Sequence, residues 1–369
     1  MRALLITAFL GLGAFAVACG SGSEEAPALE DAGTADGSVR DAAAADARAD
    51  ANQDAGSDAS RPDARADGAV ADAGGDGGTP DAGPGDAGAG DAGDPCAPCT
   101  WSGFGNAGPV TPAAGMAELS GLAASATRPG ILYAHNDSGD SARFFALDAT
   151  GLRVGEYALG GFTAIDWEDI AVGPCGSDLA GSCVFLADIG DNLRDRASVT
   201  IYRVSEPQGA AGSVASCSIS FTYPDGPHDA EALFIDGAGA LHIVTKETNG
   251  ASTVFSLGVP RGNASVVATK VGKLPPFNFG LDLPSRVTGA DFFPAAQCPK
   301  LVIRTYGSVE LFTGQPGDTV ATLIARAPKT LPRILTEQQG EAVAFSRAGT
   351  ELFTVGETAS ATLHRADCR

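Results

Sequence analysis

The chain has 369 residues, of which 45 are acidic and 24 are basic, and its formal net charge at pH 7 is −21. This balance, together with the lack of a basic cluster, argues against nucleic acid as a partner, because binding to phosphates requires gathered lysine and arginine. The charge is unevenly spread and divides the chain into three parts.

Residues 1–19 predict a secretory signal. Arg2 gives a positive start, residues 3–17 are apolar, and small residues precede Cys19. The apolar run is too short to anchor the chain as a stable membrane span. The segment resembles a bacterial lipoprotein signal, which implies a lipidated Cys19; plain secretion is the alternative. Gly20 follows in place of an aspartate, so the resemblance implies the outer membrane, contacted through the lipid anchor only.

Residues 20–95 predict a disordered tether. The segment has no aromatic residue, repeats "DAG", and contains 18 acidic but only 4 basic side chains. Such a sequence cannot bury enough apolar surface to offset the entropy lost on ordering, and its like charges repel. We expect a self-repelling spacer between the anchor and a folded domain at residues 96–369.

Five repeats organise residues 96–369. Each begins with a small or polar residue and an apolar strand, and the starts are separated by 48, 63, 58 and 52 residues. Further β-rich runs follow each start, with almost no helical periodicity. The repeats begin with "SGLAAS", "EDIAVG", "EALFID", "GADFFP" and "EAVAFS".

Repeats of this kind predict an all-β fold, a β-propeller with five four-stranded blades. The fourth strands are expected in "RVGEYAL", "CSISFTY", "ASVVATKV" and "TVATLIA". The last repeat has no fourth strand, and the N-terminal "CTWSGFG" would supply it and close the ring. Six blades remain an alternative, because the two longest spacings could conceal irregular strands, and a pair of β-sandwiches is a third.

Propeller geometry would gather acidic residues at one end of the central channel. Aligned by repeat, the residues that open the innermost strands are Ser120, Glu168, Glu231, Gly289 and Glu341. Two residues earlier stand Glu118, Asp166, Asp229, Val287 and Gln339. A ring of carboxylates is unfavourable without a compensating cation, and oxygen ligands favour Ca²⁺ or Mg²⁺.

The loops between second and third strands add charges on the same face. "NDSGDS" and "ADIGDN" share an Asp-x-Gly-Asp pattern, which adds Asp137 and Asp188 to the candidate metal ligands. Lys246 and Arg304 bring positive charge. Two interpretations remain open: the acids bind a metal or ligand, or they cap turns and pair with basic residues to hold the blades together.

No specific enzyme motif is present in the sequence, whether a nucleophile elbow, a zinc-binding helix or a phosphate-binding loop. His135 and His228 fall in the converging loops and are the candidate general acid or base residues. His242 and His364 lie in apolar strand runs and are interpreted as structural.

The motifs "ELSGLA", "ALDATG", "DWEDIA", "DIGDN", "HDAEAL" and "TKE" resemble the phytase-like or SdiA-regulated group of extracytoplasmic β-propellers. The resemblance covers about residues 117–350 and is fainter to the five-bladed calcium-activated nucleotidases. It implies calcium ligands at Glu118, Asp166, Glu168, Glu231 and Glu341. It implies an anion-binding role for Lys246 and Arg304.

Two functions follow from these observations. The first is a ligand-binding or interaction module, monomeric and stabilised by calcium, that recognises a small anionic ligand or an exported protein or glycan. The alternative is a calcium-dependent phosphoester hydrolase, in which Lys246 and Arg304 stabilise the added charge. Because propellers host many activities without catalysis, the binding module is the preferred interpretation.

Cysteines predict disulfides, as expected in an oxidising compartment. Cys175 and Cys183 flank a short loop and would pair locally. Cys368 would pair with Cys96 or Cys99, where the N-terminal strand closes the ring. Cys217 and Cys298 would pair only if the lower loops of their blades meet, and would otherwise remain thiols.

Overall fold

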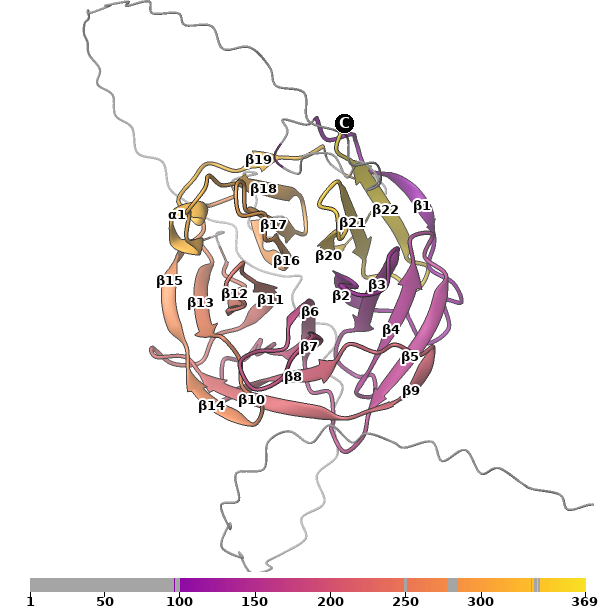
Figure 1. Ribbon diagram of the computed structural model, residues 1–369, viewed down its shortest axis with the longest axis horizontal. Coiled ribbons are helices and arrows are strands. Elements are labelled where there is room, and N and C mark those ends of the chain that lie inside the picture. Colours follow the sequence, from indigo (N-terminus) through magenta and orange to yellow (C-terminus); the bar gives the residue numbers. More distant parts are fainter. Residues whose placement is uncertain are drawn as a thin grey trace, which may run out of the picture. The chain divides into compact units, whose positions relative to one another are not determined.

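The computed structural model describes residues 96, 100–248, 251–277, 285–332, 334, 337 and 339–369. Five small sheets surround a central channel, each with its first strand innermost (Figure 1). The predicted five-bladed propeller is therefore confirmed, and six blades or a sandwich pair are excluded. Cys19, the signal segment and the tether lie outside the described residues. Within the described residues, no helix has the length and apolar character needed to cross a membrane.

Blades 1 and 2 each have five strands. Blade 1 contains β2 (Leu119–Ala124), β3 (Ile131–Asn136), β4 (Arg143–Asp148), β5 (Arg153–Leu159) and β9 (Ala211–Val214). Blade 2 contains β6 (Trp167–Pro174), β7 (Ser182–Asp188), β8 (Val199–Ser205), β10 (Ser216–Thr222) and β14 (Ala264–Val267). The fifth strands, β9 and β14, pair in parallel with the preceding blade. They account for the long second and third repeats that suggested a sixth blade.

Blades 3 and 4 each have four strands. Blade 3 contains β11 (Ala230–Ile235), β12 (Leu241–Thr245), β13 (Thr253–Gly258) and β15 (Thr269–Lys273). Blade 4 contains β16 (Val287–Phe293), β17 (Lys300–Thr305), β18 (Val309–Thr313) and β19 (Lys329–Thr330). The single strand predicted at "ASVVATKV" is wrong, because this run divides between β14 of blade 2 and β15 of blade 3.

The strand predicted at "TVATLIA" is also wrong, because the run forms the short helix α1 (Val320–Ile324). Thr319 caps its N-terminus, and the side chains of Thr319 and Thr322 form a reciprocal capping box. Val320, Leu323 and Ile324 are buried at helical spacing. The cap and this apolar stripe together outweigh the β-branched composition, and β19 becomes the fourth strand instead.

Blade 5 is completed by the N-terminal segment. It contains β20 (Gly340–Phe345), β21 (Glu351–Gly356), β22 (Thr362–Asp367) and β1 (Gly105–Pro109). β1 pairs antiparallel with β22, and Trp101 bridges to Cys368 just before it. The predicted ring closure is thus confirmed, although the regular strand starts only at Gly105, the end of the "CTWSGFG" run.

The core consists of five apolar clusters, one at each interface between adjacent blades. Between blades 1 and 2, for example, Tyr133 and Phe144 pack in one cluster with Trp167 and Leu186. Each buried side chain of this size contributes roughly 1.5–3 kcal/mol relative to its exposed state. Because every blade packs against two neighbours, the ring holds the channel-facing residues in fixed positions.

Disulfides link the chain at separate points. Cys175 and Cys183 are bonded, as are Cys96 and Cys298. The second bond overturns two expectations, because Cys96 is not the partner of Cys368 and Cys298 does not pair with Cys217. Cys217 and Cys368 are also disulfide-bonded, so neither is a thiol. Cys99, the other expected partner of Cys368, lies outside the described residues. These bonds are typical of an oxidising compartment.

Candidate metal centre

A bulge repeats at the start of every innermost strand. In each blade, the pairing of the first strand with the second skips one residue. A bulge of this kind re-aims the unpaired side chain. The five skipped residues are Ser120, Glu168, Glu231, Thr288 and Glu341. The sequence alignment of blade 4 was therefore wrong by one residue, because Thr288 and not Gly289 occupies this position.

The hydroxyl residues at these bulges connect blades, whereas the glutamates face a cavity. Ser120 Oγ donates to the carbonyl of Glu168 at 2.6 Å. Thr288 Oγ1 donates to the carbonyls of Gly340 and Glu341 at 2.8 and 2.9 Å. Glu168, Glu231 and Glu341 line the cavity described below, which Ser120 also borders. At this repeat position, therefore, three blades supply a carboxylate and two supply a hydroxyl that bonds to a neighbouring blade.

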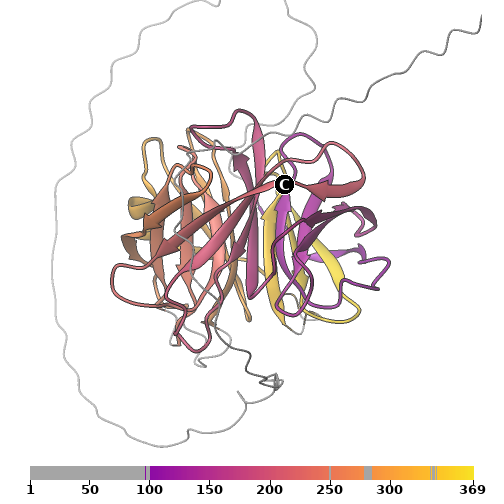
Figure 2. The same cartoon turned by 90° about the horizontal axis from the view of Figure 1, so that it is seen from below.

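The loops of the propeller gather at the two ends of its strands (Figure 2). At one end, a polar cavity of about 90 Å³ is lined by residues from all five blades. Six of them are carboxylic acids, and Lys246 is the single basic residue in the described lining. The residues are Ser120, Asp137, Ser138, Asp166, Glu168, Asn192, Glu231, Lys246, Tyr306, Glu341 and Glu357. We call this space the acidic cavity.

Three carboxylates on one side of the acidic cavity could hold a metal ion. One oxygen each from Asp137, Asp166 and Glu168 lies within 4.8 Å of the others. Asp137 follows β3 of blade 1, and the other two residues begin blade 2. Gly190 closes this side, since a Cβ atom there would overlap the carboxylate oxygens of both Asp166 and Glu168. Hard oxygen ligands of this kind suit Ca²⁺ or Mg²⁺.

Lys246 is the basic residue of the described lining of the acidic cavity. Lys246 Nζ lies 2.6 Å from Glu231 Oε1 and 5.3 Å from the centre of the Tyr306 ring. Burial lowers the pKa of Lys246, but Glu231, Tyr306 and Glu168 outweigh it, so the pKa is raised. Lys246 therefore remains charged and supplies the one positive charge of the described lining.

One lysine does not offset the burial of the carboxylates around it. Burial, with Asp137 and Asp229 nearby, raises the pKa of Asp166 to about 7. Burial and the charge of Glu231 raise the pKa values of Glu168 and Glu341 well above the ordinary value. For Glu231 itself, burial outweighs the effect of Lys246, and the pKa rises to about 7. These groups retain protons near neutral pH unless a cation replaces them.

Three predicted ligands lie outside the acidic cavity. Glu118 is exposed. Asp229 accepts a hydrogen bond from the backbone N–H of Asp191 at 2.9 Å. Asp188 is buried, accepts N–H donors from the start of blade 2, and pairs with Arg196 at 2.7 Å. Asp188 thus closes its own loop instead of facing the channel.

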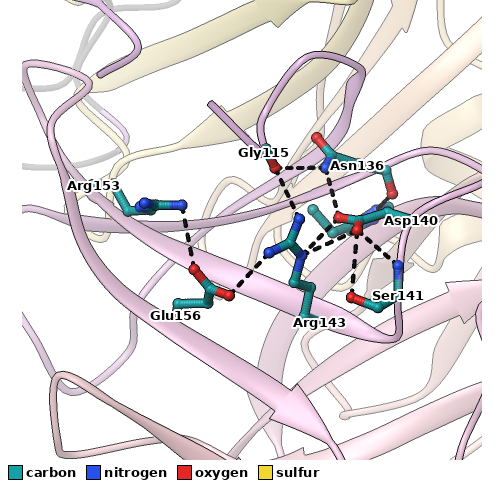
Figure 3. Close-up of polar contacts among 8 residues, drawn as sticks. Gly115, Asn136, Asp140, Ser141, Arg143, Arg153 and Glu156 are labelled. Atoms are coloured by element: carbon teal, nitrogen blue, oxygen red, sulfur yellow. Dashed lines mark hydrogen bonds and ion pairs between the residues drawn. The ribbon is translucent and has the colours of Figure 1, made fainter. Parts of the chain in front are cut away.

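Asp140 illustrates the same structural use of an Asp-x-Gly-Asp pattern (Figure 3). Its carboxylate accepts hydrogen bonds from Asn136 Nδ2 at 2.7 Å and Arg143 Nε at 2.9 Å. Arg143 continues the network to Glu156 at 3.0 Å, which Arg153 also contacts. Within this cluster each carboxylate is paired with a guanidinium group.

The predicted anion-binding and acid–base residues mostly lie apart from the acidic cavity. Arg304 is buried and forms an ion pair with Glu337. His135 is fully buried against Trp167, and burial lowers its pKa to about 4. His228 contacts Asp225 at 2.9 Å and packs on Tyr223. None of the three lines the acidic cavity, and Lys246 is the predicted residue that does.

Sequence reasoning missed Tyr306 and Glu357. Both immediately follow the second strand of their blade, as do Asp137 and Lys246. Four of the five residues at this repeat position line the acidic cavity. Aligning the repeats on the end of the second strand would have identified them.

No family model and no curated protein matches the chain. Among solved structures, PQQ-bound aldose sugar dehydrogenase from Streptomyces coelicolor is 11% identical, with a TM-score of 0.44, covering 75% of this chain and 100% of that one. A gluconolactonase from Xanthomonas campestris is 15% identical, with a TM-score of 0.38, covering 69% of this chain and 73% of that one. Soluble aldose sugar dehydrogenase from Escherichia coli is 12% identical, with a TM-score of 0.37, covering 73% of this chain and 100% of that one. Similarities this distant assign no function to the chain.

Proposed function

We propose that the chain is a cell-envelope lipoprotein whose propeller presents a ligand-binding module with a calcium site at the acidic cavity. One observation carries the proposal: six carboxylic acids line a cavity of about 90 Å³ with a single lysine among its described lining. A group of buried carboxylates is costly unless a cation compensates it. The cation would make the five-bladed ring more stable and prepare one face for a partner.

Asp137, Asp166 and Glu168 would hold the ion, because their oxygens already converge. Ca²⁺ fits this set better than Mg²⁺, since Ca²⁺ accepts several carboxylates in irregular geometry, whereas Mg²⁺ demands near-octahedral geometry. When bound, Ca²⁺ supplies positive charge at the channel mouth that attracts anionic groups of a ligand. Ser138 and Asn192, both exposed at the rim, offer polar contacts to that ligand.

The calcium proposal is tested by thermal unfolding of the full chain with Ca²⁺ or with a chelator. A ligand that binds only the folded state at 100 times its Kd adds about 2.7 kcal/mol to the unfolding free energy. Ca²⁺ should therefore raise the melting temperature, and Glu168→Gln should remove most of that rise. The matched control is Asp195→Asn, which changes an exposed carboxylate on a loop of the same face. An equal response of wild type and Glu168→Gln would overturn the proposal.

Attachment to the membrane is a separate part of the proposal and rests on Cys19 and the residues before it. Cys19→Ser should release the protein from membranes into the soluble fraction. Retention of the variant in membranes after a high-salt wash would contradict a lipid anchor, while leaving the calcium site untouched.

Phosphoester hydrolysis is the second candidate, favoured by the position of Lys246 beside the converging carboxylates. Against it, Lys246 is paired with Glu231, and Arg304 is paired with Glu337 away from the cavity. Turnover of a generic phosphomonoester that disappears with chelator and with Lys246→Met would establish this activity. Absence of turnover by a calcium-loaded protein supports the binding module.

A further inference from the structure

A second cavity, of about 550 Å³, lies between blades 3 and 4. Its walls include the turn between β11 and β12 and the turn between β16 and β17. These turns are at the opposite end of the strands from the loops that form the acidic cavity. The volume is within the range of pockets that bind small molecules.

His242 distinguishes this cavity from the other interfaces between blades. It lies in β12 opposite Phe234 of β11. At the equivalent position of the second strand, the other four blades have apolar or aromatic residues: Tyr133, Phe185, Val302 and Phe353. A histidine at this position loses part of the apolar packing and places a polar side chain in the cavity wall.

Neighbouring groups fix the orientation and the tautomer of His242. Its Nε2 lies 2.9 Å from Asp236 Oδ2, and its ring stacks on Phe234 with centroids 4.9 Å apart. Asp236 is itself held by backbone N–H groups of Ala238 and Ala240. Because a carboxylate accepts the hydrogen of Nε2, Nδ1 of the neutral ring is a hydrogen-bond acceptor.

That acceptor has no partner among the described residues. His242 is 4% exposed, and no described hydrogen-bonding group contacts Nδ1. Leaving a buried acceptor unpaired is costly, and such atoms in folded proteins normally have a partner, often water or a ligand. The side chain lines the cavity, but Nδ1 itself is shielded, so a donor inside the cavity reaches it only after a small rotation of the ring.

We propose that this cavity binds a mainly apolar, uncharged molecule whose single hydroxyl or N–H group donates to His242 Nδ1. Phe292, Val271 and Pro294 provide apolar walls for the body of the molecule. Ser256 is paired directly across from His242 and offers a second polar contact. Asp236 and Asp318 already have hydrogen-bond partners in His242 and Arg326, so neither carboxylate requires a charged group of the ligand.

Phenol and anisole are matched probes, because both have an aromatic body and only phenol donates a hydrogen bond. The chain contains four histidines, so histidine labelled with ¹⁵N in the full chain gives a simple spectrum. Phenol should shift the Nδ1 resonance of His242 and bind about 5- to 10-fold more tightly than anisole. Chelator should change neither result, because the acidic cavity is not involved.

His242→Leu removes the acceptor and introduces an apolar side chain, as Val302 provides at the equivalent position of blade 4. In this variant phenol and anisole should bind with equal affinity. Equal affinity of both probes for wild type, absence of a His242 shift, or loss of phenol binding with chelator would each overturn the proposal. The affinities of phenol and anisole for the wild-type chain test the proposal even if the variant does not fold.

Discussion

The acidic cavity and the loops of blades 1 and 2 contain the same residue type in opposite electrostatic conditions. In the loops, Asp140 and Asp188 are each bonded to an arginine and to backbone N–H groups. In the acidic cavity, six carboxylic acids share Lys246 as the one basic residue of the described lining. The loop aspartates therefore close turns, whereas the cavity acids repel one another and retain protons or a cation.

This difference shows what distinguishes a candidate metal site from a structural network. It is whether nearby donors and basic groups balance the negative charge of the carboxylates, and not the number of acidic residues. Both regions were candidate metal ligands from the sequence, and both occur near the same end of the strands. A carboxylate surrounded by donors is stabilised as an anion, and its removal leaves those donors unpaired. Removal of charge from the acidic cavity relieves repulsion. Substitutions in the two regions should therefore have opposite signs.

The largest effect is expected for Asp188→Ala. The substitution leaves Arg196 without its carboxylate partner and leaves the N–H groups of Ile165 and Asp166 without an acceptor. We expect the unfolding free energy to fall by about 3–5 kcal/mol, as when one member of a buried ion pair is removed. Urea unfolding of wild type and variant measures this difference in unfolding free energy. A loss below about 1 kcal/mol would show that the loop is not held by this pair.

The Arg196→Leu substitution in the Asp188→Ala background is the control. It removes the uncompensated guanidinium group, so the double variant should recover part of the lost stability. No recovery would mean that the backbone donors, and not the ion pair, account for the effect.

Asp291 provides a third environment, in which a partly buried carboxylate accepts hydrogen bonds from backbone N–H groups. Its oxygens accept the N–H groups of Phe292 and Phe345 at 2.8 Å each. Burial outweighs these bonds and raises the pKa of Asp291 to about 7. Between pH 4 and 7 the folded state therefore binds the proton more tightly than the unfolded state. Stability should fall as pH rises through this window, by at most about 1.4 kcal/mol per pH unit for one group.

Asp291→Asn should reduce this slope when urea unfolding is repeated with chelator between pH 4.5 and 7. The slope is the readout, because the amide also alters the absolute stability by changing an acceptor into a donor. Asp166 and Glu231 contribute with the same sign and remain in the variant, so a residual slope is expected. An unchanged slope would show that Asp291 is ionised throughout.

The five-bladed ring was predictable because the sequence features that indicate its strands are local and recur in every repeat. Apolar strand starts at regular spacing identified five blades, and the strand missing from the last repeat indicated closure by the N-terminus. The helix α1 was not predictable from β-branched composition, since one capping box determines it. The parallel strands β9 and β14 were missed because their pairing with a preceding blade depends on contacts distant in sequence.

The acidic cavity was predictable in outline but not in membership. Glu168, Glu231 and Glu341 were found because they share one repeat position. The bulge at that position aims all three side chains into the cavity. Asp188 lies outside the lining of the acidic cavity, and nothing in "ADIGDN" reveals that Arg196, eight residues later, folds back on it. Arg304 was placed on the right face, but its partner Glu337 comes from another blade. Pairing between loops, and not residue type, decided these cases.

A smaller effect of opposite sign is expected for Glu168→Gln without calcium. Without a cation, the folded chain must protonate Glu168 or bury its charge, whereas the unfolded chain ionises it freely, and glutamine removes this cost. We expect the unfolding free energy in chelator to rise by about 1 kcal/mol. Chemical unfolding of wild type and variant in the same chelator measures the difference. A destabilised variant would mean that the Glu168 carboxylate is already compensated, as Asp188 is.

The smallest effect is expected for Asp140→Asn, in the compensated network of Figure 3. Burial raises the pKa of Asp140, but bonds from Arg143, Asn136 and the Ser141 N–H outweigh it and leave the pKa lowered. The pair is partly exposed, so the variant should lose only about 0.5–1 kcal/mol at pH 7. Because the folded-state pKa lies below the unfolded value, this difference should shrink as pH falls below about 4. The rise in melting temperature with Ca²⁺ should be unchanged. A reduced response to Ca²⁺ would place Asp140 within the metal site and remove the distinction between the two acidic regions.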